Sequence, residues 1–246
     1  MKSHLTPKRP TRSYILWFTQ RVGSSVLAQA LIDTGVAGRP QELCNAENLA
    51  GVMERNAATD GSTLRQALWR EGTTSNGVFG LKYGMYPPLH TAMLAMMCAA
   101  ASTDDELAAW ESFFPNCNHF VLTRRDKVRL AVSWWKSIKT HQGHRKPDEP
   151  LVPLSEEAYD YKAIHHLVRE CQEREEAIWN QLSRWGVIAD VIVYEDLAAS
   201  FESTVRRVLD RLGFDTRNMA IPAPAFARTA DALSERWVER YLSERG

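Results

Sequence analysis

The chain has 246 residues, enough for a single domain with a substantial core. Its 30 basic and 30 acidic side chains cancel, which excludes a global electrostatic field that favours nucleic acid or an anionic membrane surface. Four widely separated cysteines, without CxxC or Cys/His metal-ligand spacing, predict a reducing, cytoplasmic setting and no metal site. The basic residues 1–12 lack an apolar segment, so we interpret them as a flexible terminus and not as a secretory signal.

Four short β-prone runs alternate with helical patterns along the remaining residues, 13–246. The expected strands are Ser13–Thr19, Gly77–Lys82, His119–Thr123 and Asp190–Tyr194. The expected helices are Ser24–Thr34, Leu49–Arg55, Thr63–Arg70, Leu89–Ala101, Glu106–Phe114, Lys127–Lys139, Tyr161–Trp185, Thr204–Leu212 and Ser234–Leu242. Nearly continuous apolar residues in three of the strands are typical of a sheet buried on both faces. The pattern predicts one α/β domain, a three-layer sandwich with a central, mainly parallel sheet.

Two long segments interrupt this alternation. Residues 141–160 contain three prolines and many charges, and we expect a surface loop that lies over a ligand site. The expected helix Tyr161–Trp185 carries an apolar stripe that packs either on the sheet or on a second copy of the chain. The sequence leaves this choice, and therefore a homodimer, open. The apolar run at 89–101 is too short to cross a bilayer as a helix.

The first strand ends in the turn "QRVGSS", residues 20–25. Ligands of open parallel sheets bind at the carboxyl ends of the strands. Arg21, the backbone amides near Gly23 and the hydroxyls of Ser24 and Ser25 at a helix start favour a phosphate or sulfate there. The patterns GxxxxGK[ST] and GxGxxG are both absent, which argues against an NTPase and a dinucleotide dehydrogenase. A plain capped turn is the structural alternative.

The third strand ends in a second cationic turn, within "FVLTRRDKVRLAVSWWKS". Arg124 and Arg125 follow the strand, and Ser133 comes nine residues after Arg124 on the next helix. A guanidinium and a hydroxyl in this arrangement can hold a second phosphate from two directions. Two such cradles on one sheet edge predict a ligand with two separated anionic groups, whereas solvated surface arginines are the alternative.

These segments resemble the sulfotransferases that use 3′-phosphoadenosine 5′-phosphosulfate (PAPS), and among them the bacterial carbohydrate group typified by trehalose sulfotransferase. "QRVGSSVLAQALIDTGVAGRPQE" is similar to the family's 5′-phosphosulfate loop, and "RRDKVRLAVSWWKS" to its 3′-phosphate motif. "GVFGLKYGM", "VIVYEDL" and "ARTADALSERWVERY" are similar to its middle strand, a late strand and its C-terminal stretch. The resemblance covers nearly the whole chain. It implies a P-loop-like sulfotransferase fold and transfer of a sulfuryl group from PAPS to a hydroxyl of a small carbohydrate or glycolipid, which leaves 3′-phosphoadenosine 5′-phosphate (PAP).

The resemblance also implies roles for individual residues. Those expected to hold the 5′-phosphosulfate are Arg21, Gly23, Ser24 and Ser25. Those expected to hold the 3′-phosphate are Arg124 and Ser133, with Arg228 as a weaker third contact. Arg125 stays an alternative to Arg124, because the serine follows the arginine by eight residues in some relatives.

For catalysis, the resemblance implies in-line transfer with Glu42 of "GRPQE" as the general base. Lys82 and Arg21 are expected to act on the transferring group. Larger eukaryotic relatives use a histidine two residues after a strand lysine, but that position here is Gly84. His90, which follows the same strand, is the alternative base.

The acceptor side departs from the family pattern. Arg39 stands where the trehalose enzyme has an acidic residue, and Leu43 and Cys44 replace two aromatic residues. These differences question trehalose as the acceptor, and Arg39 suggests one that carries negative charge. A non-catalytic PAPS- or PAP-binding protein on the same fold is the alternative function.

Overall fold

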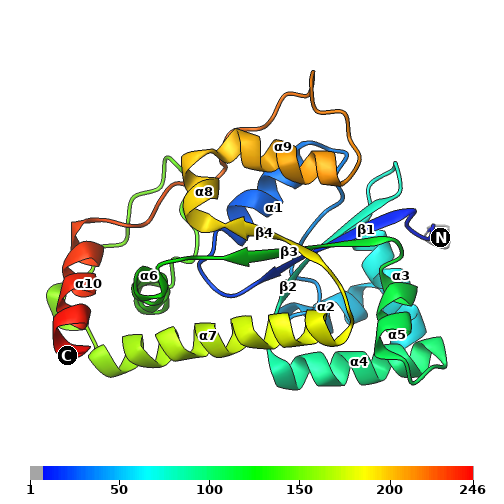
Figure 1. Ribbon diagram of the computed structural model, residues 1–246, viewed down its shortest axis with the longest axis horizontal. Coiled ribbons are helices and arrows are strands. Elements are labelled where there is room, and N and C mark those ends of the chain that lie inside the picture. Colours follow the sequence, from blue (N-terminus) through cyan, green and yellow to red (C-terminus); the bar gives the residue numbers. More distant parts are fainter. Residues whose placement is uncertain (1–7, 246) are drawn as a thin grey trace.

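The computed structural model describes residues 8–245 (Figure 1). Its centre is a sheet of four parallel strands in the order β2-β1-β3-β4. The strands are β1 (Arg12–Phe18), β2 (Val78–Gly84), β3 (Cys117–Thr123) and β4 (Ala189–Val193). Because all four run in the same direction, their carboxyl ends meet at one edge of the sheet, as Figure 1 shows for β1 and β3.

Helices cover both faces of the sheet and extend beyond its carboxyl edge (Figure 1). They are α1 (Ser24–Asp33), α2 (Ala46–Arg55), α3 (Gly61–Gly72), α4 (Pro87–Ala101), α5 (Glu106–Phe113), α6 (Lys127–Thr140), α7 (Tyr161–Arg184), α8 (Tyr194–Ala199), α9 (Phe201–Arg211) and α10 (Ala232–Arg245), with a short 3₁₀ turn η1 (Glu156–Ala158). One core lies between the sheet and α1, α8 and α9, and another lies between the sheet and α2 to α5. The expected three-layer α/β architecture is confirmed.

Short polar side chains determine where many of these helices begin. The N-caps of α3, α5, α6 and α7 are aspartates whose carboxylates accept hydrogen bonds from the first turn; they are Asp60, Asp105, Asp126 and Asp160. Asn45 caps α2 in the same way. Asp126 therefore fixes the start of α6 directly after the two arginines that follow β3.

The strand and helix positions agree with the expected ones apart from shifts at their ends. The strand β2 continues to Gly84, so Lys82 lies inside the strand and does not close it as expected. The short helix α8 begins at Tyr194, where the sequence pattern predicted only the end of a strand. Most of the proposed flexible terminus, residues 1–7, lies outside the described residues, and β1 begins at Arg12.

The apolar stripe of α7 is covered by the chain itself. Ile164, Leu167 and Val168 pack with residues of α6 and α10, while Ile178 and Leu182 join the core under the sheet. Of the two alternatives for this stripe, the structure therefore shows packing within the chain. Among residues 8–245, no helix is both long and apolar enough to cross a membrane.

Candidate active site

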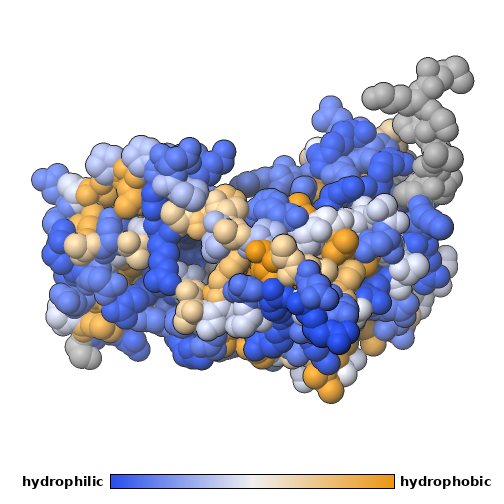
Figure 2. Space-filling model, turned by 90° about the horizontal axis from the view of Figure 1, so that it is seen from above, coloured by the Kyte–Doolittle hydropathy of each residue, from blue (hydrophilic) through white to orange (hydrophobic). Residues whose placement is uncertain are grey.

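A cavity of about 550 Å³ opens at the carboxyl edge of the sheet. Its walls come from the turn after β1, the starts of α1 and α8, one face of α6 and two segments far along the chain, 143–145 and 224–230. Figure 2 shows the corresponding face of the molecule hollowed between the α10 end and the main body. Cofactor and small-molecule sites typically have volumes of roughly 300–1,000 Å³.

The turn after β1 has a backbone that requires its glycine. Arg21 and Gly23 both adopt left-handed conformations, with φ of 63° and 79°. A Cβ atom at Gly23 would also lie 3.0 Å from the Tyr194 ring and 3.1 Å from Leu197. Glycine thus lets the turn pack closely on α8 while Ser24 begins α1 at the cavity wall. The amino end of α1 is consequently directed at the cavity, where its dipole favours an anion.

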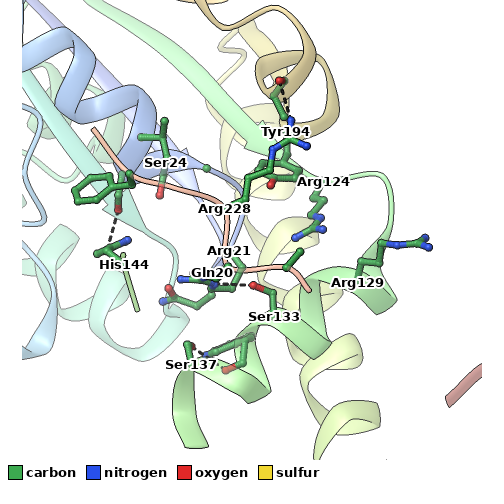
Figure 3. Close-up of a pocket in the computed structure, with 18 of the residues that line it drawn as sticks. Gln20, Arg21, Ser24, Arg124, Arg129, Ser133, Ser137, His144, Tyr194 and Arg228 are labelled. Atoms are coloured by element: carbon green, nitrogen blue, oxygen red, sulfur yellow. Dashed lines mark hydrogen bonds between the residues drawn. The ribbon is translucent and has the colours of Figure 1, made fainter. Parts of the chain in front are cut away.

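Arg21 joins segments that are distant in the sequence. Its Nε donates to Ser133 Oγ at 3.0 Å and its Nη2 donates to Thr229 Oγ1 at 3.1 Å, while Nη1 donates to the carbonyl of Gly143. Figure 3 shows the hydrogen bond that joins Arg21 and Ser133, both of which line the cavity. The two expected anion cradles therefore form parts of one continuous site.

Arg124 and Arg125 have different environments although they are adjacent. Arg124 is only 9% exposed and lines the cavity, with its guanidinium 4.4 Å from the centre of the Tyr194 ring. Its Nε has no hydrogen-bond partner in the described part of the chain, and a Glu195 carboxylate oxygen lies 3.8 Å away. Arg125 instead donates to both carboxylate oxygens of Asp196, at 2.7 and 2.9 Å, on the exposed surface. This arrangement separates the two candidates, because Arg124 alone faces the cavity.

Burial lowers the pKa of both cavity arginines from the ordinary value. For Arg21, burial has the largest effect and the positive charge of Arg124 lowers the pKa further. For Arg124, burial is again the main cause, and Tyr194 and Glu195 oppose it. Two desolvated cations that repel each other are stabilised when an anion enters between them.

Lys82 and Glu42 form an ion pair next to Ser25, at the start of α1. Lys82 is 6% exposed, and its Nζ donates to Glu42 Oε1 at 2.8 Å and to Ser25 Oγ at 2.7 Å. Asn45 donates to the other carboxylate oxygen, Oε2, at 3.1 Å. A short parallel bridge, in which Lys82 N donates to the carbonyl of Gln41 at 3.1 Å, holds Glu42 beside β2.

His90, the alternative base, lies elsewhere. It is 6% exposed and packs among the rings of Trp17, Trp110 and Trp185, and its Nδ1 is 2.9 Å from the hydroxyl of Tyr83. This aromatic group belongs to the core on the other face of the sheet. The structure therefore separates His90 from the cavity, which Glu42 lines.

The positions that depart from the family pattern also lie away from the cavity. Leu43 and Cys44 are buried in the core, with 2% and 3% exposure. Arg39 is exposed, and its Nη1 donates weakly to the carbonyl of Glu71 at 3.4 Å. None of the three lines the cavity, so they do not form its wall beside Glu42.

Arg228, the expected third contact of the 3′-phosphate, lines the cavity and donates to the carbonyl of Ala198 at 3.0 Å (Figure 3).

Sequence reasoning did not assign Gly143, His144 or Thr229 to the site. His144 Nε2 lies 3.2 Å from Ser25 Oγ. For Gly143 and His144 the sequence signal was the expectation that loop 141–160 covers a ligand site, and residues 143–145 do line the cavity. For Thr229 the signal was its place in "ARTADALSERWVERY", beside Arg228.

The structure is an α/β protein with an arginine-lined cavity at the carboxyl edge of a parallel sheet. The family model described as Stf0 sulphotransferase matches residues 13–244. The chain is 32% identical to a trehalose 2-sulfotransferase of Mycobacterium tuberculosis over 266 aligned positions, covering 96% of each chain. It is 30% identical to the trehalose 2-sulfotransferase of Mycolicibacterium smegmatis, over 93% of this chain and 94% of the relative.

The chain therefore belongs to the Stf0 sulphotransferase family, and the expected resemblance to trehalose sulfotransferases is confirmed. It is an enzyme of the sulfotransferase class. Among solved structures, the sulfotransferase domain of the Synechococcus PCC 7002 olefin synthase is similar at 12% identity, with a TM-score of 0.42 over 97% of this chain and 98% of that one.

Proposed function

We propose that this enzyme transfers the sulfuryl group of PAPS to a hydroxyl of a small carbohydrate or glycolipid, with Glu42 as the general base. The observation that carries the proposal is that Glu42, paired with Lys82, lines the same cavity as Arg21 and Arg124. Sulfuryl transfer, like phosphoryl transfer, needs cations around the donor and a base for the acceptor hydroxyl. This cavity combines both.

The residues of the cavity fit the two anionic groups of PAPS. Arg21, Ser24, Ser25 and the amide end of α1 would hold the 5′-phosphosulfate, and Arg124, Ser133 and Arg228 would hold the 3′-phosphate. The orphaned Nε of buried Arg124 supports this fit, because a phosphate oxygen supplies the acceptor that Nε lacks. When bound, PAPS supplies an activated sulfuryl group whose leaving group is the 5′-phosphate of PAP.

Glu42 has one oxygen better suited to take the proton of the acceptor hydroxyl. Its Oε1 accepts from the ammonium group of Lys82, whereas Oε2 accepts from the neutral amide of Asn45. Because the charged hydrogen bond holds Oε1 more strongly than the neutral one holds Oε2, we assign the proton to Oε2. The ammonium group of Lys82 then neutralises the negative charge that develops on the leaving oxygen.

The curated relatives are named for trehalose, a neutral sugar, and we propose the same class of acceptor for this chain. The positions that suggested otherwise from sequence, Arg39, Leu43 and Cys44, do not line the cavity. An acceptor with an additional negative charge therefore has no support from Arg39.

Calorimetric binding of PAP beside AMP, which lacks the 3′-phosphate, tests the donor half of the proposal. We expect tight binding of PAP and a loss of about a hundredfold for AMP, which corresponds to about 2.7 kcal/mol for the 3′-phosphate contacts. Equal binding of the two nucleotides would contradict the assignment of Arg124 and Ser133.

Transfer from PAPS to trehalose and to a panel of neutral and anionic glycans, followed by mass spectrometry, tests the acceptor half. We expect a sulfated neutral glycan. If the protein binds PAP but sulfates only anionic glycans, the acceptor class is wrong while the donor assignment stands.

A further inference from the structure

The loop residue His144 meets the group of side chains around the proposed transfer site. Its Nε2 lies 3.2 Å from Ser25 Oγ, and the same oxygen is 2.7 Å from Lys82 Nζ. Lys82 in turn contacts Glu42 at 2.8 Å. A continuous chain of hydrogen bonds therefore runs from the proposed base to a histidine that comes from a different part of the sequence.

One arrangement of donors and acceptors in this chain gives the hydroxyl hydrogen of Ser25 a partner. An ammonium group can only donate, so Lys82 donates to both Glu42 and Ser25. If His144 Nε2 also donated to Ser25 Oγ, the Ser25 hydrogen would have no partner in the described part of the chain. If that hydrogen instead points at Nε2, the ring hydrogen lies on Nδ1 and the imidazole is neutral.

Several contacts fix the imidazole in this orientation. The His144 and Phe226 rings lie with centroids 5.0 Å apart and planes inclined by 32°. The next residue, Arg145, accepts a backbone hydrogen bond from Ala227 at 2.8 Å and donates from Nη2 to the carbonyl of Arg228 at 3.1 Å. The loop and the C-terminal segment thus support each other and bring His144 to Ser25.

We infer that His144 is a positioning residue of the transfer site, whose neutral imidazole accepts the hydroxyl hydrogen of Ser25 and directs the Ser25 oxygen toward Lys82. The inference rests on the proposed function, because Lys82 there neutralises the charge on the leaving oxygen, while Ser25 meets the 5′-phosphosulfate through its backbone amide at the start of α1. A hydroxyl held in one orientation keeps the Lys82 ammonium group in place without first losing rotational freedom. The expected effect is therefore on sulfuryl transfer from PAPS and not on binding of the acceptor.

The charges around His144 favour the required neutral form. Partial burial lowers the pKa of His144 from its ordinary value of 6.5, and the positive charges of Lys82 on β2 and Arg21 in the first turn lower it further. Glu42, before α2, has the opposite effect, while Ser25 on α1 and Phe226 in the C-terminal segment carry no charge. His144 is hence neutral near pH 7, and the arrangement is lost as the pH falls below 6.5 through the lowered pKa.

Three variants, compared with the wild type, separate this role from a general effect of the loop. In His144→Gln, the side-chain carbonyl reaches about where Nε2 lies and still accepts from Ser25, whereas His144→Ala removes the acceptor. His141→Asn is the matched control, because His141 is on the same loop, has φ of 53° and does not line the cavity, and asparagine tolerates this backbone. Thermal melting verifies that each variant is folded.

We expect His144→Ala to lower kcat/KM for PAPS by up to about tenfold, the effect of losing one hydrogen bond. His144→Gln should stay within about threefold of the wild type at pH 7.5 and lose less activity on acidification, because its amide does not titrate. His141→Asn should match the wild type. Activity of His144→Ala equal to that of the wild type, or an unchanged acid limb in His144→Gln, overturns the inference.

A measurement on the ligand-free protein gives a result that does not depend on activity. ¹H–¹⁵N spectra of the histidine rings, assigned with His144→Gln, should show His144 as the Nδ1–H tautomer with a pKa below 6.5. The Nε2–H tautomer overturns the inference even if the enzyme is active. A wild type that neither binds PAP nor forms a sulfated product contradicts the proposed function instead.

Discussion

Two regions on opposite faces of β2 both contain a histidine among polar side chains, but one region is charged and the other is neutral. The side chain of Lys82 contacts Glu42 and Ser25, which line the cavity, whereas the next residue, Tyr83, faces an aromatic cluster that contains His90 and Trp110. Alternation of side chains along a strand produces this division. One residue step therefore separates the proposed chemistry from the core.

The difference lies in how each region balances its buried polar groups. In the aromatic cluster, Tyr83 contacts His90 at 2.9 Å and Trp17 donates to His119 Nδ1 at 2.9 Å, and burial lowers the pKa of both histidines. These groups are neutral and each has one internal partner, although His90 Nε2 and Trp110 Nε1 have none in the described part of the chain. In the cavity, Arg21 and Arg124 are desolvated and repel each other. Burial thus serves stability on one face and ligand binding on the other.

Replacing the proposed base should have the largest effect on the cavity side. We expect Glu42→Gln to lower kcat by about 10²–10⁴-fold, since the amide cannot accept the proton of the acceptor hydroxyl. Binding of PAP should change little, and the control Glu47→Gln on the exposed start of α2 should keep full activity. Steady-state kinetics and calorimetry measure both. A Glu42→Gln variant with the kcat of the wild type would contradict the assignment of Glu42 as the general base.

The matching change on the aromatic side should affect stability alone. Trp110 is fully buried and stacks on Trp17 with ring centroids 5.2 Å apart. We expect Trp110→Ala to lower the free energy of unfolding by about 3–5 kcal/mol through the cavity it creates. Urea unfolding measures this loss. If PAP affinity of the folded variant fell as well, the two regions would be coupled and the comparison would fail.

Acid should destabilise the aromatic side through His119. Burial lowers its pKa from 6.5 to about 4, so the unfolded chain binds a proton at a higher pH than the folded one. The neutral form contributes its full stability above pH 6.5, and about 3 kcal/mol is lost as the pH falls from 6.5 through 4. In His119→Asn, a side-chain oxygen can still accept from Trp17 without titrating. Urea unfolding between pH 4 and 7.5 should show a shallower pH dependence for this variant than for the wild type.

The adjacent arginines offer the most direct test of the cavity charge. Arg124→Ala should weaken PAP binding by about a hundredfold, or about 2.7 kcal/mol, while Arg125→Ala on the surface should change it by less than about twofold. We also expect Arg124→Ala not to lower the free energy of unfolding, because it removes a desolvated cation that Arg21 repels. Equal losses of PAP affinity in the two variants would contradict the assignment of Arg124. Calorimetry and urea unfolding together decide the matter.

Much of this molecule follows from local sequence patterns. The four strands were predicted within two residues at each end, because continuous apolar runs bounded by turns have few alternatives in an α/β chain. The helix α8 was missed because it is six residues long and directly continues β4. The choice between Glu42 and His90 also stayed open, since each can also be explained as a polar residue near the start of a predicted helix.

The sequence by itself determined the family, the parallel α/β architecture and the two cationic turns, because each depends on residues close together in the chain. Only the tertiary structure decided that Arg21 meets Ser133 and Thr229, the latter 208 positions away. The same holds for His144 beside Ser25 and for His90 in the core. Contacts of this kind depend on how loops return over the sheet edge, and the loop sequences carry no periodic pattern that reports their partners.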